Sequence, residues 1–288
     1  MKIPLSVFCL LLLVASCSGG KSSNGSESDS IADSLTDSMP PMPLDKEDSL
    51  MAEVTVSKAA DGVFYDFVAS FCQNSKYQKT RILFPLQRTV NGSTYSIKQH
   101  QWHFSKLHFN NDAYTVFFAS SKDLELEKAQ GIDTVTVQWY EMAKNQASNY
   151  RFAKIDGQWM LTAIEEHPIE EDVNSDFILF YSTFAADPAY QAEHLAETIT
   201  YDGIDPDNDD EFDAQFVKNR KISASNWSEN LIPILPAQTF SNIDFGQDLS
   251  ESTSERVVSL ESPGSGFTSR LYFRRSGDTW HLFKIENY

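Results

Sequence analysis

The sequence has few cysteines, few basic residues and no long apolar run. Three cysteines in 288 residues are too few for a disulfide scaffold, so hydrophobic cores must stabilise the fold. Lys and Arg total 23 against 41 Asp and Glu, a net charge of −18, which excludes the basic surface that binds nucleic acids. The apolar stretch at residues 4–14 is shorter than the roughly 20 residues that a membrane-spanning helix needs.

The sequence is instead rich in aromatic side chains. It contains 20 Phe, 11 Tyr and 5 Trp, and 41% of its residues are hydrophobic. A chain of this length with this apolar content can build the cores of one or two domains, which excludes wholesale disorder.

The N-terminus has the features of an export signal. Residues 1–16 contain Lys2, an apolar stretch and small residues before Cys17. Residues 14–17, Val-Ala-Ser-Cys, resemble the lipobox of bacterial lipoproteins, which implies removal of the signal peptide and acylation of Cys17. Ser18 in place of Asp favours the outer membrane, with periplasmic or surface exposure. If Cys17 is acylated, the lipid attaches the protein to the membrane. The alternative is an ordinary signal peptide followed by an incidental cysteine.

Residues 17–54 are predicted to be a flexible acidic tether. Ser, Asp and Pro dominate the segment, and it lacks an apolar period. It contains four Asp-Ser-hydrophobic tripeptides, which resemble the acceptor of a general O-glycosylation system in certain diderm bacteria. Chance matches in a low-complexity segment are the alternative. The resemblance implies possible O-glycosylation at Ser30, Ser34, Ser38 and Ser49.

The rest of the sequence contains an internal repeat. Aromatic and apolar residues at positions i, i+3, i+4 and i+7 within 64–71 recur 113 residues later within 177–184, which predicts two amphipathic helices. A second set of residues recurs with identical side chains 121 positions later: Phe152, Trp159, Leu161, Ile164 and Glu165. We therefore predict two tandem units at residues 55–170 and 171–288.

Strand signals follow the helix signals in both units. Val135, Val137 and Trp139 alternate with polar residues, as in a half-buried strand, and Asp156-Gly157 is a typical hairpin turn. The predicted fold class is α+β. In each unit an N-terminal helix pair would pack on a curved antiparallel sheet.

This order of elements, ending in Phe-x6-Trp-x-Leu-x2-Ile-Glu, resembles the nuclear-transport-factor-two-like or ketosteroid-isomerase-like cone fold. With the lipobox, the chain is similar to uncharacterised bacterial lipoproteins that carry tandem cone domains. The resemblance implies a cone-shaped fold and a pocket, but it brings no established activity.

If a pocket is present, aromatic side chains at the mouth of the sheet are its candidate ligand-binding residues, although core packing is the alternative for each. These are Trp102, Tyr114, Trp139, Trp227 and Phe240. Enzymes of the cone fold use a polar pair inside the cone. Asp66 is replaced by Leu179 in the second unit, and no acid–base pair can be matched, so we assign no catalytic residue.

We predict no cofactor and no firm metal site. The acidic run 202–213 is interpreted as an insertion in the second unit, in a solvated loop. Asp205, Asp207 and Asp209 have the spacing of a calcium loop, but Gly and Glu are missing at the sixth and twelfth loop positions, so they are only a weak Ca²⁺ candidate. Cys72 lies in the first predicted helix pattern and is interpreted as a buried structural thiol.

The leading functional hypothesis is a non-catalytic binding or interaction module of the cell envelope. Its partner would be an envelope protein, a glycan or a small apolar ligand. Two alternatives remain: an isomerase- or hydrolase-type enzyme that uses one cone, and a structural envelope spacer.

Overall fold

The computed structural model describes residues 61–107, 114–129, 131–207, 215–250, 253–262 and 266–288, and all structural statements below concern these residues. Val54–Tyr288 form one compact unit. No helix in the described ranges is both long enough and apolar enough to cross a membrane. The predicted signal peptide, Cys17, the tether and its four candidate glycosylation serines lie outside the described residues.

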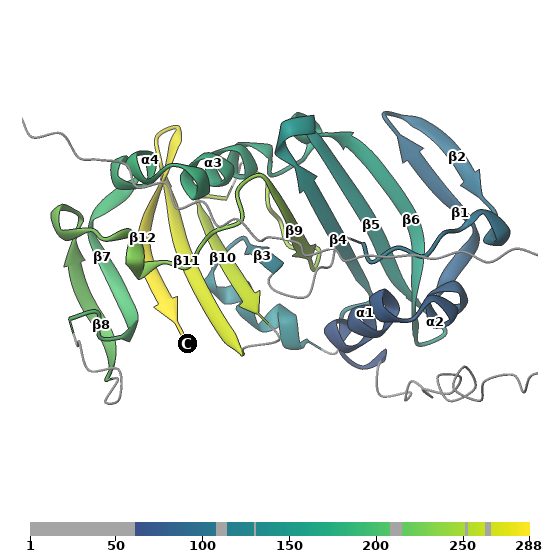
Figure 1. The fold of residues 1–288 in the computed structure, drawn as a ribbon, viewed down its shortest axis with the longest axis horizontal. Helices are drawn as coiled ribbons and strands as arrows, with labels where there is room; N and C mark the ends of the chain where they lie inside the picture. Colours follow the sequence, from purple (N-terminus) through teal and green to yellow (C-terminus); the bar gives the residue numbers. More distant parts are fainter. Residues whose placement is uncertain (1–60, 108–113, 130, 208–214, 251–252, 263–265) are drawn as a thin grey trace, which may run out of the picture. The chain divides into compact units, whose positions relative to one another are not determined.

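Two helices followed by six strands occur twice along the chain (Figure 1). The first half comprises α1 (Phe64–Gln73), α2 (Ser75–Thr80), β1 (Ile82–Val90), β2 (Ser93–Ile97), β3 (Tyr114–Phe118), β4 (Thr134–Glu141), β5 (Gln146–Ile155) and β6 (Gln158–Pro168). The second half comprises α3 (Ser175–Ala186), α4 (Pro188–Glu193), β7 (Leu195–Ile204), β8 (Phe216–Ser223), β9 (Thr239–Asp244), β10 (Glu255–Ser262), β11 (Phe267–Ser276) and β12 (Thr279–Asn287). The predicted α+β class is confirmed, whereas the division into two units at residue 170 stays a prediction.

Short-range sequence signals explain where these elements begin and end. The side chain of Asn74 accepts hydrogen bonds from two backbone N–H groups at the start of α2, and Asp187 does the same for α4, 113 residues later. Asp156 and Gly157 join β5 to β6 with φ values of 51° and 77°, so the predicted hairpin turn is confirmed.

All twelve strands form one sheet, in the order β2-β1-β6-β5-β4-β9-β3-β10-β11-β12-β7-β8. If each half formed its own sheet, β3 would lie beside β4 and β9 beside β10. Instead β9 pairs antiparallel with β4, and β3 pairs antiparallel with β10. We call this arrangement the strand exchange. It joins the two halves at the middle of the sheet, where β3 and β9 meet in parallel (Figure 1).

The helices of the two halves cover opposite faces of the sheet. Along β3, Val116 and Phe118 belong to the core cluster beneath α1, whereas Phe117 belongs to the cluster beneath α3. Successive side chains of a strand point to opposite faces, so the two clusters lie on opposite sides. Each half therefore has one sheet face covered by its own helices and one face that they leave uncovered.

Candidate functional site

Four of the five aromatic residues predicted as ligand-binding candidates are divided between the two core clusters. Trp102 and Tyr114 pack with the cluster beneath α1, and Trp227 and Phe240 with the cluster beneath α3. Trp139 is half-buried on β4. The structure therefore does not bring the five together, and none of them lines the groove described below. Their role in ligand binding stays a prediction.

Trp102 illustrates how such a residue is fixed in the core. Its indole Nε1 donates a hydrogen bond to Oε1 of the buried Gln78 at 2.9 Å. The Gln78 amide Nε2 in turn donates to the carbonyl oxygens of Phe71 and Ser105, at 3.0 and 2.7 Å. These contacts satisfy the polar atoms of both side chains, so Trp102 joins α1, α2 and the segment after η2 (Gln99–Gln101).

Aromatic rings fill the space between each first helix and the sheet. Phe64 lies 5.4 Å from Phe152 and 5.0 Å from Trp159, measured between ring centroids. In the second half, Phe177 lies 5.5 Å from Phe273 and 5.1 Å from Trp280, with the same edge-to-face geometry. These spacings are typical of packed aromatic cores.

A small group of titratable residues borders the core cluster beneath α1. Tyr65 on α1 stacks on Tyr114 with ring centroids 5.3 Å apart. Burial, and secondarily the nearby carboxylate of Glu261, raises the pKa of Glu127 to about 7. The Glu127 carboxyl can therefore accept or donate a proton near neutral pH. The side chains of Tyr65, Tyr114, Glu127 and Glu261 do not line the groove described below.

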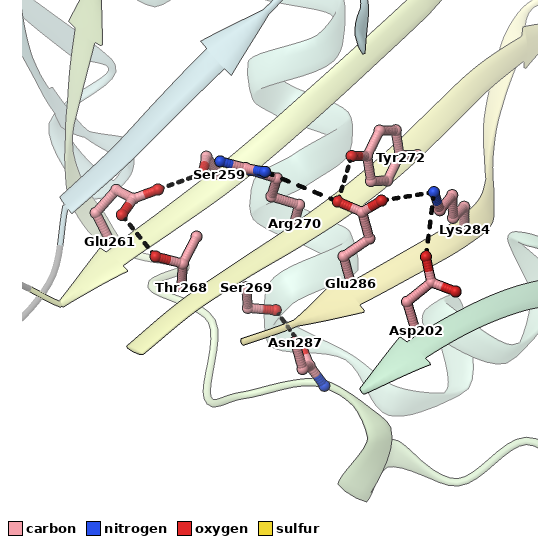
Figure 2. Close-up of polar contacts among 10 residues, drawn as sticks. All are labelled: Asp202, Ser259, Glu261, Thr268, Ser269, Arg270, Tyr272, Lys284, Glu286 and Asn287. Carbon is pink, nitrogen blue, oxygen red and sulfur yellow. Dashed lines mark hydrogen bonds and ion pairs between the residues drawn. The ribbon is translucent and has the colours of Figure 1, made fainter. Parts of the chain in front are cut away.

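The face of the second half that α3 and α4 do not cover carries a network of polar side chains on β10, β11 and β12, several of them buried (Figure 2). Glu286 accepts a hydrogen bond from Tyr272 Oη at 2.6 Å and pairs with Lys284 Nζ at 2.5 Å. Lys284 also lies 3.5 Å from a carboxylate oxygen of Asp202 on β7. Burial and the Glu286 carboxylate raise the pKa of Tyr272.

A second carboxylate on the same face is held by hydroxyl groups. Glu261 accepts hydrogen bonds from Ser259 at 2.5 Å and from Thr268 at 2.9 Å (Figure 2). Arg270 on β11 pairs with Ser259 of β10 on one side and with Glu286 of β12 on the other. Its guanidinium group lies 3.9 Å from the Glu286 carboxylate. The charged groups of this face are thus paired with one another, which favours a role in joining strands β7 and β10–β12.

The uncovered face of the first half contains an open groove of about 410 Å³. It is lined by Thr89, Gly92, Thr136, Gln138, Asn149, Arg151, Glu165, Glu166, His167, Glu171, Asp172, Val173 and Asp244. Seven of these residues belong to the paired strands β4, β5 and β6, which form the base of the groove. A volume of this size lies within the range of small-molecule sites.

Hydrogen bonds orient several of the groove side chains. Arg151 pairs with Glu165 at 2.6 Å, and Tyr140 Oη donates to Asp172 at 3.1 Å. The Asn149 amide lies 3.0 Å from Nε2 of His167, whose Nδ1 lies 2.9 Å from the Pro168 carbonyl oxygen. With Nδ1 as the donor, Nε2 accepts from the Asn149 Nδ2 group.

The groove is acidic. Its lining contains five carboxylates and one guanidinium group: Glu165, Glu166, Glu171, Asp172 and Asp244 against Arg151. Burial raises the pKa of Asp244, and Asp172 raises it further, whereas a backbone hydrogen bond from Gly246 and the charge of Arg151 lower it. The negative charge at this end of the groove is therefore incompletely compensated.

Sequence reasoning did not single out the groove residues. Thr136 and Gln138 belong to the polar side of the half-buried strand that the sequence predicts at 134–139, and no sequence motif marks them as a site. Their cross-strand neighbours Arg151 and Asn149 follow the same alternation. This row of amide, hydroxyl and charged groups on paired strands is the signal that could have indicated the site.

The acidic run at 202–213 divides into two parts. The solvated loop predicted to begin at residue 202 begins later, because β7 continues to Ile204 and buries Asp202 in the sheet. Asp205 and Asp207 both pair with Arg220, whereas Asp209 lies outside the described residues. Among the residues that the structure describes, no group of three or more acidic, His or Cys side chains is placed to hold a metal ion.

Cys72 is a free, buried thiol, as predicted. Burial raises its pKa to about 12, so the reactive thiolate is scarce at neutral pH. We expect the native protein to resist iodoacetamide at pH 8 and the unfolded protein to react at Cys72 within minutes. Mass spectrometry of a Cys9→Ser, Cys17→Ser chain, in which Cys72 is the one remaining thiol, measures this difference, and rapid labelling of the native protein would contradict it.

Comparisons with known proteins are consistent with this architecture. Residues 44–287 match a family model described as a domain of unknown function, DUF4348. The crystal structure of an NTF2-like protein from Bacteroides fragilis is similar to the chain, with 32% sequence identity and a TM-score of 0.68. The similarity covers 79% of this chain and 96% of that protein. A search of curated proteins finds no match. The chain therefore belongs to the DUF4348 family and has an NTF2-like structure.

Proposed function

We propose that the chain is a lipid-anchored, non-catalytic binding protein of the outer envelope, and that the acidic groove is its ligand site. In this proposal Cys17 carries the lipid and residues 17–54 form the tether. The two halves are tandem cone units that have exchanged one strand. The ligand is hydrophilic, such as a glycan or a peptide of the envelope.

The contrast between the helix-covered spaces and the open groove carries this proposal. The helix-covered spaces are filled with Phe and Trp rings, so they offer little room for a small apolar ligand. The groove is open, is lined mostly by polar side chains, and rests on paired strands. A rigid site with convergent polar groups is typical of specific recognition of hydrophilic molecules.

The site can be tested by filling it. Thr136 lines the groove from β4, and a Trp side chain there would occupy much of its volume. Trp is tolerated in strands, so Thr136→Trp should keep the fold. We expect the parent chain, purified from its own envelope, to retain a hydrophilic ligand in native mass spectrometry, and Thr136→Trp to lose at least nine-tenths of it.

Thr134→Trp is the matched control. Residue 134 lies on the same strand and points to the same face, but it is exposed and does not line the groove. This variant should retain ligand as the parent does. Equal retention by the Thr136→Trp variant would refute the groove as the site.

A further inference from the structure

We propose that the groove recognises a primary ammonium group of its ligand through the carboxylate of Asp244, with the amide oxygen of Asn149 as a further acceptor for the ligand's N–H groups on the same face. This inference rests on the proposed function, because it names the ligand chemistry of the same site.

Asn149 supplies an acceptor that the described protein leaves unused. Its side chain is only 8% exposed and lines the groove. Its Nδ2 group is oriented by His167, but its Oδ1 atom has no hydrogen-bond partner among the described residues. A buried acceptor without a partner costs about 1–3 kcal/mol, so such groups are uncommon in folded proteins. A ligand with N–H donors would satisfy it.

The charges near Asn149 favour a cationic donor. The nearby carboxylate of Asp172 disfavours ionisation of Asp244 and adds to the increase of its pKa that burial causes. The nearest positive group of the lining, Arg151, is already paired with Glu165 at 2.6 Å. Asp172 is stabilised by the neutral hydroxyl of Tyr140 and by the backbone N–H of Asn174. An added positive charge would therefore gain from both aspartates.

The pairing within the strands places these groups together. Thr136 of β4 pairs with Asp244 of β9 on one side and with Arg151 of β5 on the other. Gln138, two residues along β4, pairs with Asn149. Side chains two residues apart on a strand lie on the same face, so Asp244 and Asn149 lie on one surface, with strand β4 and its side chains Thr136 and Gln138 between them. The strand exchange thus contributes Asp244 to a groove built mainly by the first half.

The groove retains Asp244 although its burial is unfavourable. Burial and Asp172 together raise the pKa of this carboxyl, so its ionised form destabilises the fold above its unfolded-state pKa. An Asn side chain could keep the hydrogen bond that Asp244 Oδ1 accepts from Gly246 N at 2.8 Å. Asp244→Asn should therefore fold at least as stably as the parent, which separates a ligand-binding role from a structural one.

Calorimetric titration of the full chain at pH 7 tests the inference. Two probes carry the ammonium group on different kinds of molecule: the capped tripeptide Gly-Lys-Gly carries it on a peptide side chain, and glucosamine carries it on a sugar. Each is compared with its N-acetylated form, which keeps the shape and loses the charge. We expect at least one ammonium probe to bind, its acetylated form to bind at least tenfold more weakly, and Asp244→Asn to weaken binding at least tenfold without lowering the melting temperature.

Asp156→Asn is the matched control, because Asp156 lies in the exposed β5–β6 turn and does not line the groove. It should bind the probes as the parent does. If neither ammonium probe binds, or if acetylated probes bind equally well, the ammonium inference is wrong. Binding of Ca²⁺ alone that Asp244→Asn abolishes, without amine binding, would also overturn it. Loss of the native ligand in the Thr136→Trp variant would then still support the groove as the site.

Discussion

Replacing Asn242 by Leu is expected to lower the free energy of unfolding by about 2–6 kcal/mol, since two buried polar groups would each lose a partner worth about 1–3 kcal/mol. Asn242 is fully buried on β9. Its Oδ1 accepts a hydrogen bond from the backbone N–H of Phe117 at 2.8 Å, and its Nδ2 donates to Gln138 Oε1 at 2.7 Å. One side chain thus connects β9 to both β3 and β4. Urea unfolding monitored by Trp fluorescence measures the loss.

A double-mutant cycle separates these bonds from general disruption. Gln138→Leu alone should destabilise the chain because Asn242 Nδ2 then lacks its acceptor. The double variant should lose about 1 kcal/mol less than the sum of the two single variants. The exposed Asn226→Leu should change stability by less than about 0.5 kcal/mol. Strict additivity of the two buried substitutions would show that the Gln138–Asn242 bond does not contribute.

Replacing Arg256 by Met is expected to destabilise the protein by at least about 3 kcal/mol, because a buried guanidinium leaves several acceptors unpaired when it is removed. Arg256 is completely buried. It donates to Asn174 Oδ1 at 2.9 Å and to the carbonyl oxygens of Leu249 and Glu255 at 2.6 and 2.8 Å. These bonds hold the segment between β9 and β10 against the start of α3.

Arg275→Met provides the matched comparison for Arg256. Arg275 also lies near the Trp280 ring, at 5.8 Å compared with 5.1 Å for Arg256. It forms a single ion pair with Asp176 at 3.3 Å, and its side chain is partly exposed. Such pairs are worth about 0–1 kcal/mol, so the expected loss is small. Equal losses in the two variants would show that ring packing, and not the buried hydrogen bonds, explains the effect.

Local patterns made much of the fold predictable. The helical spacing of Phe64, Phe67, Val68 and Phe71 predicts a helix because only a 3.6-residue period puts these side chains on one face. The Asp156-Gly157 turn fixes the hairpin because both residues adopt positive φ at low cost. The strand exchange lies beyond such patterns. A strand such as β3 has the same alternation whether its neighbour is β4 or β10, and local sequence does not choose between partners.

The candidate site was less predictable than the fold for a related reason. Asp244 enters the groove through the strand exchange, so its position beside Thr136 depends on a pairing across more than a hundred residues. The buried Arg256 was also missed, because the equivalent residue 121 positions earlier is Val135 and the repeat gives no indication of a charge there. The aromatic candidates were chosen for their size, but large rings fill cores as readily as they line pockets.

The strand exchange also has a consequence for how the protein unfolds. Each half supplies a strand that completes the sheet of the other, so neither half can detach without breaking backbone hydrogen bonds in its neighbour. Melting is therefore expected to occur as one cooperative transition and not as two. A destabilising change near β2 should lower the same melting temperature as one near β8, at the opposite edge of the sheet.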